Sequence, residues 1–260
     1  MTGATTGPAA WRLVLALLAL VLLGNARDPI LVPEVSQHEV EVRQGFTGAE
    51  LLLYGAILAP DGTRAGRDYD IVVVLKGPTN PVKLREKRKF AGIWLNADSV
   101  ELHSVPSYFA VASTRPIDTI VDSKTAAIYE LGLPWLQLSP TGTIDPVAQS
   151  HFAAGLVDLM SRKGLYQQNE GAVTVKEQVL YQAHIALPSS VVTGRYTAET
   201  FAITHGRVVA SAVSNVEVRK LGLDGVVANF AEDYSFLYGL LAIALAVIMG
   251  WLAGRVFALV

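Results

Sequence analysis

Residues 83–89 read Lys-Leu-Arg-Glu-Lys-Arg-Lys, so five of seven side chains are basic, and an aromatic and polar segment follows. Cations at this density could attract an anion or an acidic patch on a partner, and a neighbouring tryptophan could supply an apolar anchor. The candidate ligand or partner surface comprises Lys83, Arg85, Lys87, Arg88, Lys89, Trp94 and Asn96. The alternative is a charged edge strand that blocks pairing between sheets, with Trp94 in the core, and the charge pattern favours this alternative.

Patterns typical of catalysis are missing from the chain. The nucleophile elbow (G-x-S-x-G), H-E-x-x-H, Walker and dinucleotide-loop motifs are all missing. No two histidines are four residues apart, so no pair could hold a metal on one helix face. The five histidines are His38, His103, His151, His184 and His205. We therefore predict no catalytic, cofactor-binding or metal-binding residues.

A long apolar segment lies near the C-terminus. Residues 236–254 contain no formal charge over nineteen positions, and a bilayer core of about 30 Å needs roughly 20 apolar residues in a helix. We predict a transmembrane helix over residues 236–255, because Arg255 can extend its charge to the headgroups. Gly250 and Gly254 form a G-x-x-x-G pattern, which lets another helix approach closely, so both are candidate helix-packing residues.

The N-terminal apolar segment is shorter. Residues 13–23 are apolar, follow Arg12, and precede Gly24-Asn25-Ala26. This pattern predicts a secretory signal peptide over residues 1–26, and the alternative is an uncleaved second anchor. Export would place residues 27–235 outside the cytoplasm and leave a cytoplasmic tail at residues 256–260. Glu232 and Asp233 before the span and Arg255 after it agree with this orientation.

Composition limits the chemistry of the exported part. The chain has no cysteine, which excludes disulfides, thiol catalysis and thiolate metal sites. Its formal net charge of −2 gives no sign of binding to a polyanion such as nucleic acid. About two hundred residues between the apolar ends suffice for one or two small domains.

Hydrophobic residues in the exported part mostly alternate, which is typical of strands. Strands are expected at residues 40–42, 51–57, 69–75, 90–95, 100–103, 108–112, 179–187, 194–203, 207–214 and 216–219, with a turn at His205-Gly206. Residues 166–171 are expected to form a polar loop.

Between these groups of strands the spacing becomes helical. Ile117, Ile120, Val121, Ile128 and Leu131 would share one face of a first helix, which Gly132 and Pro134 would end. A second helix begins with Asp145 as N-cap and Pro146, and its stripe is Phe152, Leu156, Leu159 and Met160.

The expected fold is therefore mainly β with a helical pair, that is, antiparallel β-sandwich-like lobes outside the cytoplasm and one C-terminal transmembrane helix. The expected divisions are a β-sandwich-like lobe at residues 27–114, a helical connector at 115–170, a second β-rich lobe at 171–222 and a juxtamembrane segment at 223–235. The pattern fits either two lobes joined by helices or one sandwich with an insertion.

Several segments carry a resemblance to a known family. These are QGFTGAELLLYG at 44–55, VVVLKGP at 72–78, RKFAGIWLN at 88–96, VPSYFAV at 105–111 and the single C-terminal span. Together they resemble the Alph_Pro_TM family of transmembrane proteins of alphaproteobacteria. The resemblance covers nearly the whole mature chain and implies a bacterial inner-membrane protein with its bulk in the periplasm. It supplies no catalytic or ligand-binding residues, and implies at most a role as an accessory to transport.

Three functional hypotheses follow. The favoured one is a non-enzymatic accessory or scaffold protein that contacts a larger inner-membrane protein, such as a transporter, or itself, with lipid surrounding the C-terminal helix. The second is a receptor that binds a small anion or an envelope component at the basic segment. The third is an enzyme whose site has no recognised motif.

Overall fold

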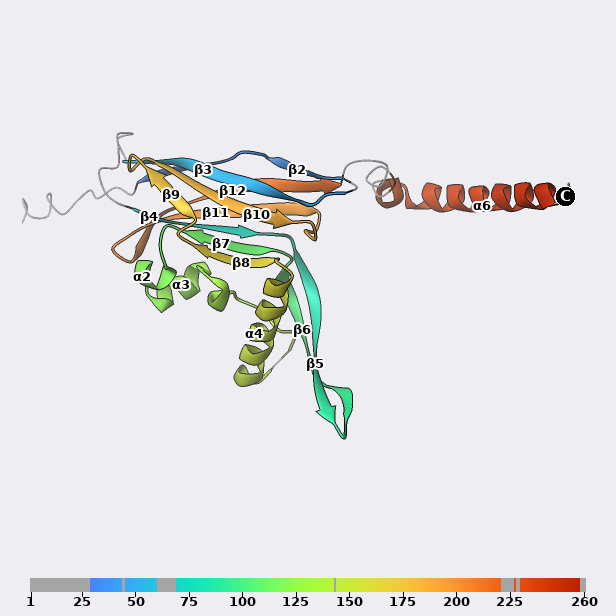
Figure 1. Ribbon diagram of the computed structural model, residues 1–260, viewed down its shortest axis with the longest axis horizontal. Coiled ribbons are helices and arrows are strands. Elements are labelled where there is room, and N and C mark those ends of the chain that lie inside the picture. Colours follow the sequence, from blue (N-terminus) through green and yellow to red (C-terminus); the bar gives the residue numbers. More distant parts are fainter. Residues whose placement is uncertain are drawn as a thin grey trace, which may run out of the picture.

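The computed structural model describes residues 29–43, 45–59, 69–142, 144–220, 227 and 230–257. They form a β-sandwich with a projecting hairpin, helices on one side and a separate C-terminal helix (Figure 1). The mainly β fold with few helices and one apolar C-terminal helix is therefore confirmed. The predicted signal peptide at residues 1–26 and residues 258–260 of the predicted tail lie outside the described residues.

Two sheets build the sandwich. The four-stranded sheet has the order β1-β3-β10-β9, with β1 Ile30–Val35, β3 Gly48–Leu58, β10 Leu180–Pro188 and β9 Val173–Lys176. The six-stranded sheet has the order β2-β12-β11-β4-β7-β8, with β2 Glu39–Val42, β12 Arg207–Lys220, β11 Gly194–Thr204, β4 Asp70–Lys76, β7 Phe109–Ser113 and β8 Tyr166–Glu170. Neighbouring strands are antiparallel except β2 with β12 and β7 with β8, which are parallel.

Each sheet contains strands that precede the helical segment in the chain and strands that follow it. β3 pairs with β10, and β4 pairs with β11. Residues 27–114 and 171–222 therefore do not form two separate lobes. The structure corresponds to the other alternative, one sandwich that carries an inserted helical segment.

The chain closes both sides of the sandwich by crossing between the sheets. On one side β1 leads into β2, and on the other β8 leads into β9 through a turn at Gly171, whose φ is +78°. Open sheet edges favour pairing with other chains. The two crossings place connected strands at these edges, which limits such pairing.

Strand β4 lies at the centre of the core. Its residues Ile71 to Leu75 are all fully buried, as expected for a continuous apolar run covered on both faces. Four buried tyrosines, Tyr108, Tyr166, Tyr181 and Tyr196, complete the core. Three of them donate hydroxyl hydrogen bonds to backbone carbonyls: Tyr108 to Ala186, Tyr166 to Pro106 and Tyr196 to Val192. Burial raises the pKa of each of these phenols, so they stay neutral donors.

The projecting hairpin continues two core strands. It consists of β5 Thr79–Phe90 and β6 Ile93–Pro106, which follow β4 and precede β7. The β4–β7 pair continues into the β5–β6 pair without a break, because Gly77 N donates to Tyr108 O (2.8 Å) and Ser107 N donates to Pro78 O (2.9 Å). One antiparallel ribbon therefore runs from the core to the hairpin's end.

The helices with described bounds are α2 Ile117–Ile120, α3 Ser123–Tyr129, the 3-10 helix η1 Leu133–Trp135, α4 Pro146–Arg162 and α6 Ser235–Phe257. The prediction of one helix across residues 117–131 is wrong, because the Asp122 side chain accepts a hydrogen bond from Thr125 N and starts a new helix, α3. Ile128, expected on the apolar face, is exposed. For α4 the predicted start is confirmed, since Asp145 accepts from Ala148 N and Pro146 is the first helical residue. The predicted stripe is wrong at Leu159, which is 45% exposed, whereas Leu156 is buried.

Most predicted strands are present, and the His205-Gly206 turn is confirmed, with positive φ at both residues. The expectation of a polar loop at residues 166–171 is wrong, because Tyr166–Glu170 forms strand β8 at a sheet edge. Edge strands face solvent and need no apolar alternation, so their sequence resembles a loop. β1 and β9, also edge strands, were not expected either.

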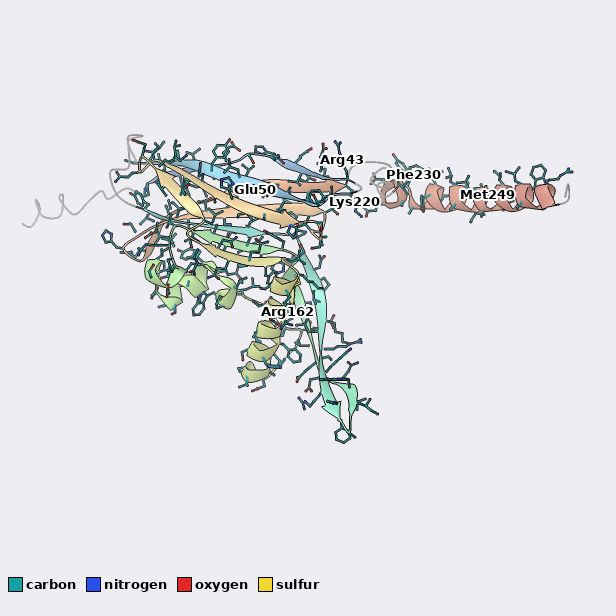
Figure 2. All side chains as sticks on the ribbon, viewed as in Figure 1. Arg43, Glu50, Arg162, Lys220, Phe230 and Met249 are labelled. Carbon is teal, nitrogen blue, oxygen red and sulfur yellow. The ribbon has the colours of Figure 1, made fainter. Side chains whose placement is uncertain are left out.

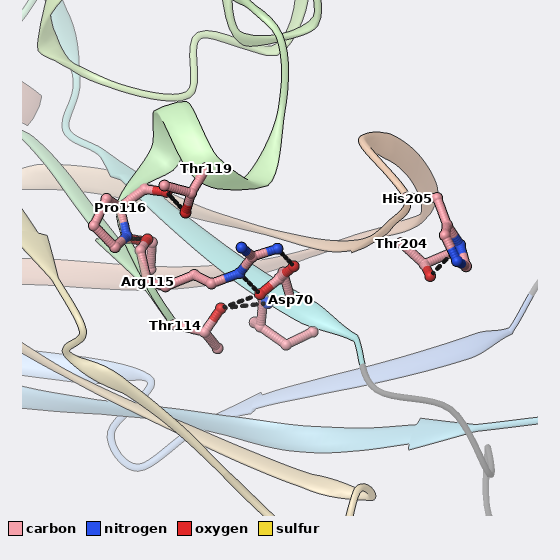
Figure 3. Close-up of polar contacts among 9 residues, drawn as sticks. Asp70, Thr114, Arg115, Pro116, Thr119, Thr204 and His205 are labelled. Atoms are coloured by element: carbon pink, nitrogen blue, oxygen red, sulfur yellow. Dashed lines mark hydrogen bonds and ion pairs between the residues drawn. The ribbon is translucent and has the colours of Figure 1, made fainter.

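A polar cluster fastens the start of β4 to the end of β7 (Figure 3). The Arg115 guanidinium donates two hydrogen bonds to the Asp70 carboxylate, with Nε to Oδ1 at 2.7 Å and Nη2 to Oδ2 at 2.6 Å. Thr114 Oγ1 donates to Asp70 Oδ1 at 3.1 Å and accepts from Ile71 N. The hydrogen bonds from Arg115 lower the pKa of Asp70 despite its partial burial.

We expect Asp70 to contribute to acid stability. Because its folded-state pKa is lowered, its contribution is present above the unfolded value of about 4 and is lost as pH falls through the folded value. Asp70→Asn should cost about 1 kcal/mol near neutral pH, since the pair is partly exposed, and flatten the acid side of the stability curve. Thermal unfolding of the detergent-solubilised protein between pH 3 and 7 measures this.

Asp158→Asn is the matched control, because Asp158 pairs with Arg162 only on the exposed surface of α4. It should leave the curve unchanged. Equal acid sensitivity in the wild-type protein and Asp70→Asn would contradict the prediction.

Candidate functional site

A tight turn joins the two strands of the projecting hairpin. Ala91 and Gly92 occupy it with φ of 48° and 87°, and Phe90 pairs with Ile93 across it. Positive φ at both central residues is typical of two-residue hairpin turns. The expectation of one strand over residues 90–95 is therefore wrong, because the turn divides that segment.

The base of the hairpin packs against α4. Val82 and Leu84 of β5, with Val100 and Leu102 of β6, form a small apolar cluster with Leu156 and other residues of α4 and the preceding loop. His103 N also donates to Ser139 O at 3.0 Å, and Thr141 N donates to Glu101 O at 2.7 Å. These contacts brace the hairpin's base, so that its far end is held away from the sandwich (Figure 1).

Beyond Glu86 the register shifts, because Glu86 pairs with Asp98 whereas Lys87 pairs with Asn96, which leaves Ala97 as an extra residue. We call residues 87–96 the tip. Directly paired residues share a face of a ladder. One face of the tip therefore carries Lys87, Lys89, Trp94 and Asn96, and the other carries Arg88, Phe90, Ile93 and Leu95.

Large apolar side chains of the tip face solvent. The exposed fractions are 72% for Phe90, 66% for Ile93, 64% for Trp94 and 52% for Leu95. The alternative is therefore wrong in placing Trp94 in the core, although residues 83–89 do lie in a charged strand, β5, of a two-stranded sheet. Exposed apolar clusters of this kind commonly mark sites of interaction with proteins or membranes.

The basic residues divide into two groups. Lys83 and Arg85 lie in the braced part, where they pair with Glu101 and Ser99 across the ladder, and their side chains are exposed. In the tip, Arg88 Nη2 lies 3.3 Å from Asp98 Oδ2 and 3.6 Å from Glu86 Oε1. Lys87 and Lys89 form no ion pair within the described part of the chain. The structure thus brings the predicted residues Lys87, Arg88, Lys89, Trp94 and Asn96 together at the tip, and leaves Lys83 and Arg85 nearer the base.

The other predicted residues lie in α6. A stretch of 21 residues from Ser235 to Arg255 is long and apolar enough to cross a membrane and is unburied. Side chains such as Met249 project from the helix with no other element beside them (Figure 2). A Cβ atom added at Gly250 or Gly254 would meet nothing within 4 Å. Both positions are therefore open to contacts from outside the described residues.

Aromatic rings mark the start of α6. Phe230 lies 5.7 Å from Tyr234 and 6.5 Å from Tyr238 between ring centroids. At the other end the Arg255 guanidinium lies 5.6 Å from the Trp251 ring. Aromatic residues at both ends, with Arg255 at the C-terminal one, suit the interfaces of a bilayer.

The histidines lie in separate places. His38, His151 and His184 each approach one glutamate, at 3.1 Å from Glu34, 3.7 Å from Glu86 and 3.0 Å from Glu50 respectively. His205 contacts Thr204 (Figure 3). Across residues 29–257, where described, no three His, Cys, Asp or Glu side chains gather in a group that could hold a metal ion.

A cavity of about 430 Å³ lies between α3 and the six-stranded sheet, beside Lys76, Glu130 and Glu199. Burial alone would lower the pKa of Lys76, but hydrogen bonds and charge from Glu130 and Glu199 outweigh it and raise the pKa. Lys76 Nζ lies 2.6 Å from Glu130 Oε2 and 3.3 Å from Glu199 Oε2. Glu130 Oε1 also accepts a hydrogen bond from Gln137 N. These groups therefore hold the helical segment on the sheet.

We expect the hairpin's orientation to depend on α4. Leu156 is 2% exposed in the cluster beneath the hairpin, so Leu156→Ala should cost about 2 to 3 kcal/mol. The loss should appear as faster amide hydrogen exchange at residues 82–86 and 99–105. Leu159→Ala is the control, because Leu159 lies on the same helix but is 45% exposed. Unchanged exchange in Leu156→Ala would show that α4 does not brace the hairpin.

Comparisons with known proteins bear on the whole chain. No curated protein and no solved structure matches it. A family model described as "Putative transmembrane protein (Alph_Pro_TM)" matches residues 30–258, which include the sandwich, the hairpin and α6. The resemblance found in the sequence is thereby confirmed, and among the described residues α6 is long and apolar enough to cross a membrane. The chain belongs to the Alph_Pro_TM family of transmembrane proteins.

Proposed function

We propose that this protein is a single-pass, membrane-anchored accessory or scaffold protein without enzymatic activity. Its sandwich and hairpin would lie in the periplasm, α6 would cross the inner membrane, and the C-terminus would be cytoplasmic. Its partner would be a larger inner-membrane protein, such as a transporter. The acidic pair Glu232 and Asp233 before α6 and Arg255 at its end support this orientation.

The observation that carries the proposal is where the exposed large apolar side chains lie. Large apolar side chains are exposed at several places, and closely spaced ones lie at the hairpin tip, with Phe90, Ile93, Trp94 and Leu95, and along α6. Neither place is a cleft that could enclose a reacting substrate. Apolar surface on a projecting arm and on a span is suited to contact with other molecules, so the chemistry supported is association.

Within the membrane, α6 offers a surface for another span. Lipid tails are as apolar as leucine side chains, so helices associate there through close van der Waals packing and polar contacts. Gly250 and Gly254 leave a low stripe on the helix, next to bulkier residues such as Trp251 and Leu252. We therefore place the contact with the partner's span at this stripe.

A second candidate function is a receptor for a small anion or an anionic envelope component. The observation that favours it is the position of Lys87 and Lys89 at the tip, where neither forms an ion pair with another described residue. Such binding would saturate and would weaken with salt, because exposed charges are screened. An accessory contact within the bilayer would be far less sensitive to salt.

The test is purification of a tagged full-length protein from native membranes in mild detergent, followed by mass spectrometry. A multi-span protein should be recovered in stoichiometric amount with the wild type, and Gly250→Ile or Gly254→Ile should reduce its recovery at least tenfold, since a branched side chain prevents close approach. The new side chains meet nothing in their own chain, so the loss would report an external contact.

Gly239→Ile is the matched control, because Gly239 also lies in α6 and also has nothing near its Cβ position. It should leave the recovery unchanged. Recovery of the chain alone from every membrane preparation would refute the accessory role. Recovery of only a second, differently tagged copy would indicate that the chain associates with itself and not with another protein.

A further inference from the structure

We infer that the hairpin tip inserts into the surface of an anionic phospholipid bilayer and forms a second membrane contact beside α6. The inference goes beyond the proposed function, since it requires no protein partner. It rests on the composition, geometry and bracing of residues 87–96.

The end of the hairpin has no charge across the turn. Residues 90–95 read Phe-Ala-Gly-Ile-Trp-Leu, and the four large side chains are more than half exposed. Three residues of β6 beyond the turn extend for about 10 Å, given about 3.3 Å per strand residue. Apolar faces of interfacial elements are buried about 5–10 Å into the headgroup and acyl boundary. The uncharged end of the hairpin matches that depth.

Cations lie directly behind the apolar end. Lys89 pairs with Trp94, and Lys87 pairs with Asn96. Residues 87–96 contain no carboxylate, and the nearest, Glu86 and Asp98, lie within 4 Å of the Arg88 guanidinium. Two lysine ammonium groups are thus available for phosphate groups when the apolar end enters the bilayer. Each cation near an anionic surface strengthens binding by roughly fivefold.

The arrangement of the apolar residues favours lipid over a protein surface. Phe90, Ile93 and Leu95 lie on one face of the ribbon, and Trp94 lies on the other. A protein surface would cover one face of this narrow ribbon and leave the other in water, unless it enclosed the tip. Lipid surrounds an inserted element on all sides, and tryptophan and lysine are residues that favour the membrane interface.

The position of the hairpin agrees with this contact. The chain belongs to a transmembrane family, and α6 is long and apolar enough to span a membrane. The hairpin and α6 leave the same end of the sandwich (Figure 1). The hairpin therefore starts from the end of the sandwich that would face the bilayer holding α6. The base of the hairpin, packed against α4, keeps the tip extended.

The chain has no cysteine, so one introduced cysteine gives a single labelling site. Ala91→Cys places an environment-sensitive fluorophore (NBD) at the exposed turn and keeps all four apolar side chains. The full-length protein is reconstituted into vesicles of phosphatidylcholine, alone or mixed with phosphatidylglycerol. We expect a blue-shifted emission and quenching by shallow spin-labelled lipids in the mixed vesicles, and at least fivefold less quenching in phosphatidylcholine.

The charge variants define the role of the lysines. Lys87→Gln with Lys89→Gln should lower the equilibrium constant for insertion of the tip by roughly twenty-five-fold in the mixed vesicles, since each lysine contributes about fivefold. Lys83→Gln with Arg85→Gln is the matched control near the hairpin's base and should reduce it far less. High salt should weaken the insertion of the wild type, because the Debye length falls to about 3 Å at 1 M.

Val213→Cys serves as the label control, because Val213 is 58% exposed on the sandwich surface. Quenching at position 91 no greater than at position 213, in either lipid, would overturn the inference. So would a blue shift at position 91 that lipid quenchers do not affect, because the label would then be covered by protein. Either result leaves the recovery of a multi-span partner through α6 untouched, so the two proposals fail separately.

Discussion

The antiparallel ribbon formed by β4 with β7 and by β5 with β6 is the interaction on which the rest of the structure depends. Within the sandwich, β4 is fully buried from Ile71 to Leu75 and also pairs with β11. Outside the sandwich the same two chain segments continue as the hairpin. The core therefore fixes where the hairpin leaves the sheet, while α4 fixes its base.

How much of the fold could be predicted from the sequence depended on how far each element is buried. Alternating or continuous apolar residues identified β3, β4, β7, β10, β11 and β12, because these strands have at least one buried face. Capping residues identified α4, whose Asp145 and Pro146 act locally. The edge strands β1, β8 and β9 were missed, because half or more of their surface faces solvent and their pattern carries little information. The break at Asp122 was missed because helical spacing continued across it.

The candidate site was predicted only in part, for a related reason. The density of charge at residues 83–89 indicated an unusual segment, and the structure places three of its cations at the tip. Whether Trp94 lies in the core or in solvent depends on the Ala91-Gly92 turn and on the shift at Ala97. Alanine is an uncommon residue for positive φ, so this turn had a weak signal. The brace from Leu156 joins distant segments and leaves no local pattern in the sequence.

The pairing between β4 and β11 has a consequence for how the protein is made. Lys76 pairs with Thr197, so the partners of the central strand lie about 120 residues apart in the chain. Long-range pairings of this kind fold slowly and leave apolar strands uncovered meanwhile. A chain synthesised from its N-terminus presents Ile71 to Leu75 long before β11 and β12 exist. Since β12 ends at Lys220 and α6 begins at Ser235, completion of the core and arrival of the anchor nearly coincide. Folding of the sandwich is thus tied to the stage of translation at which α6, the candidate span, is made.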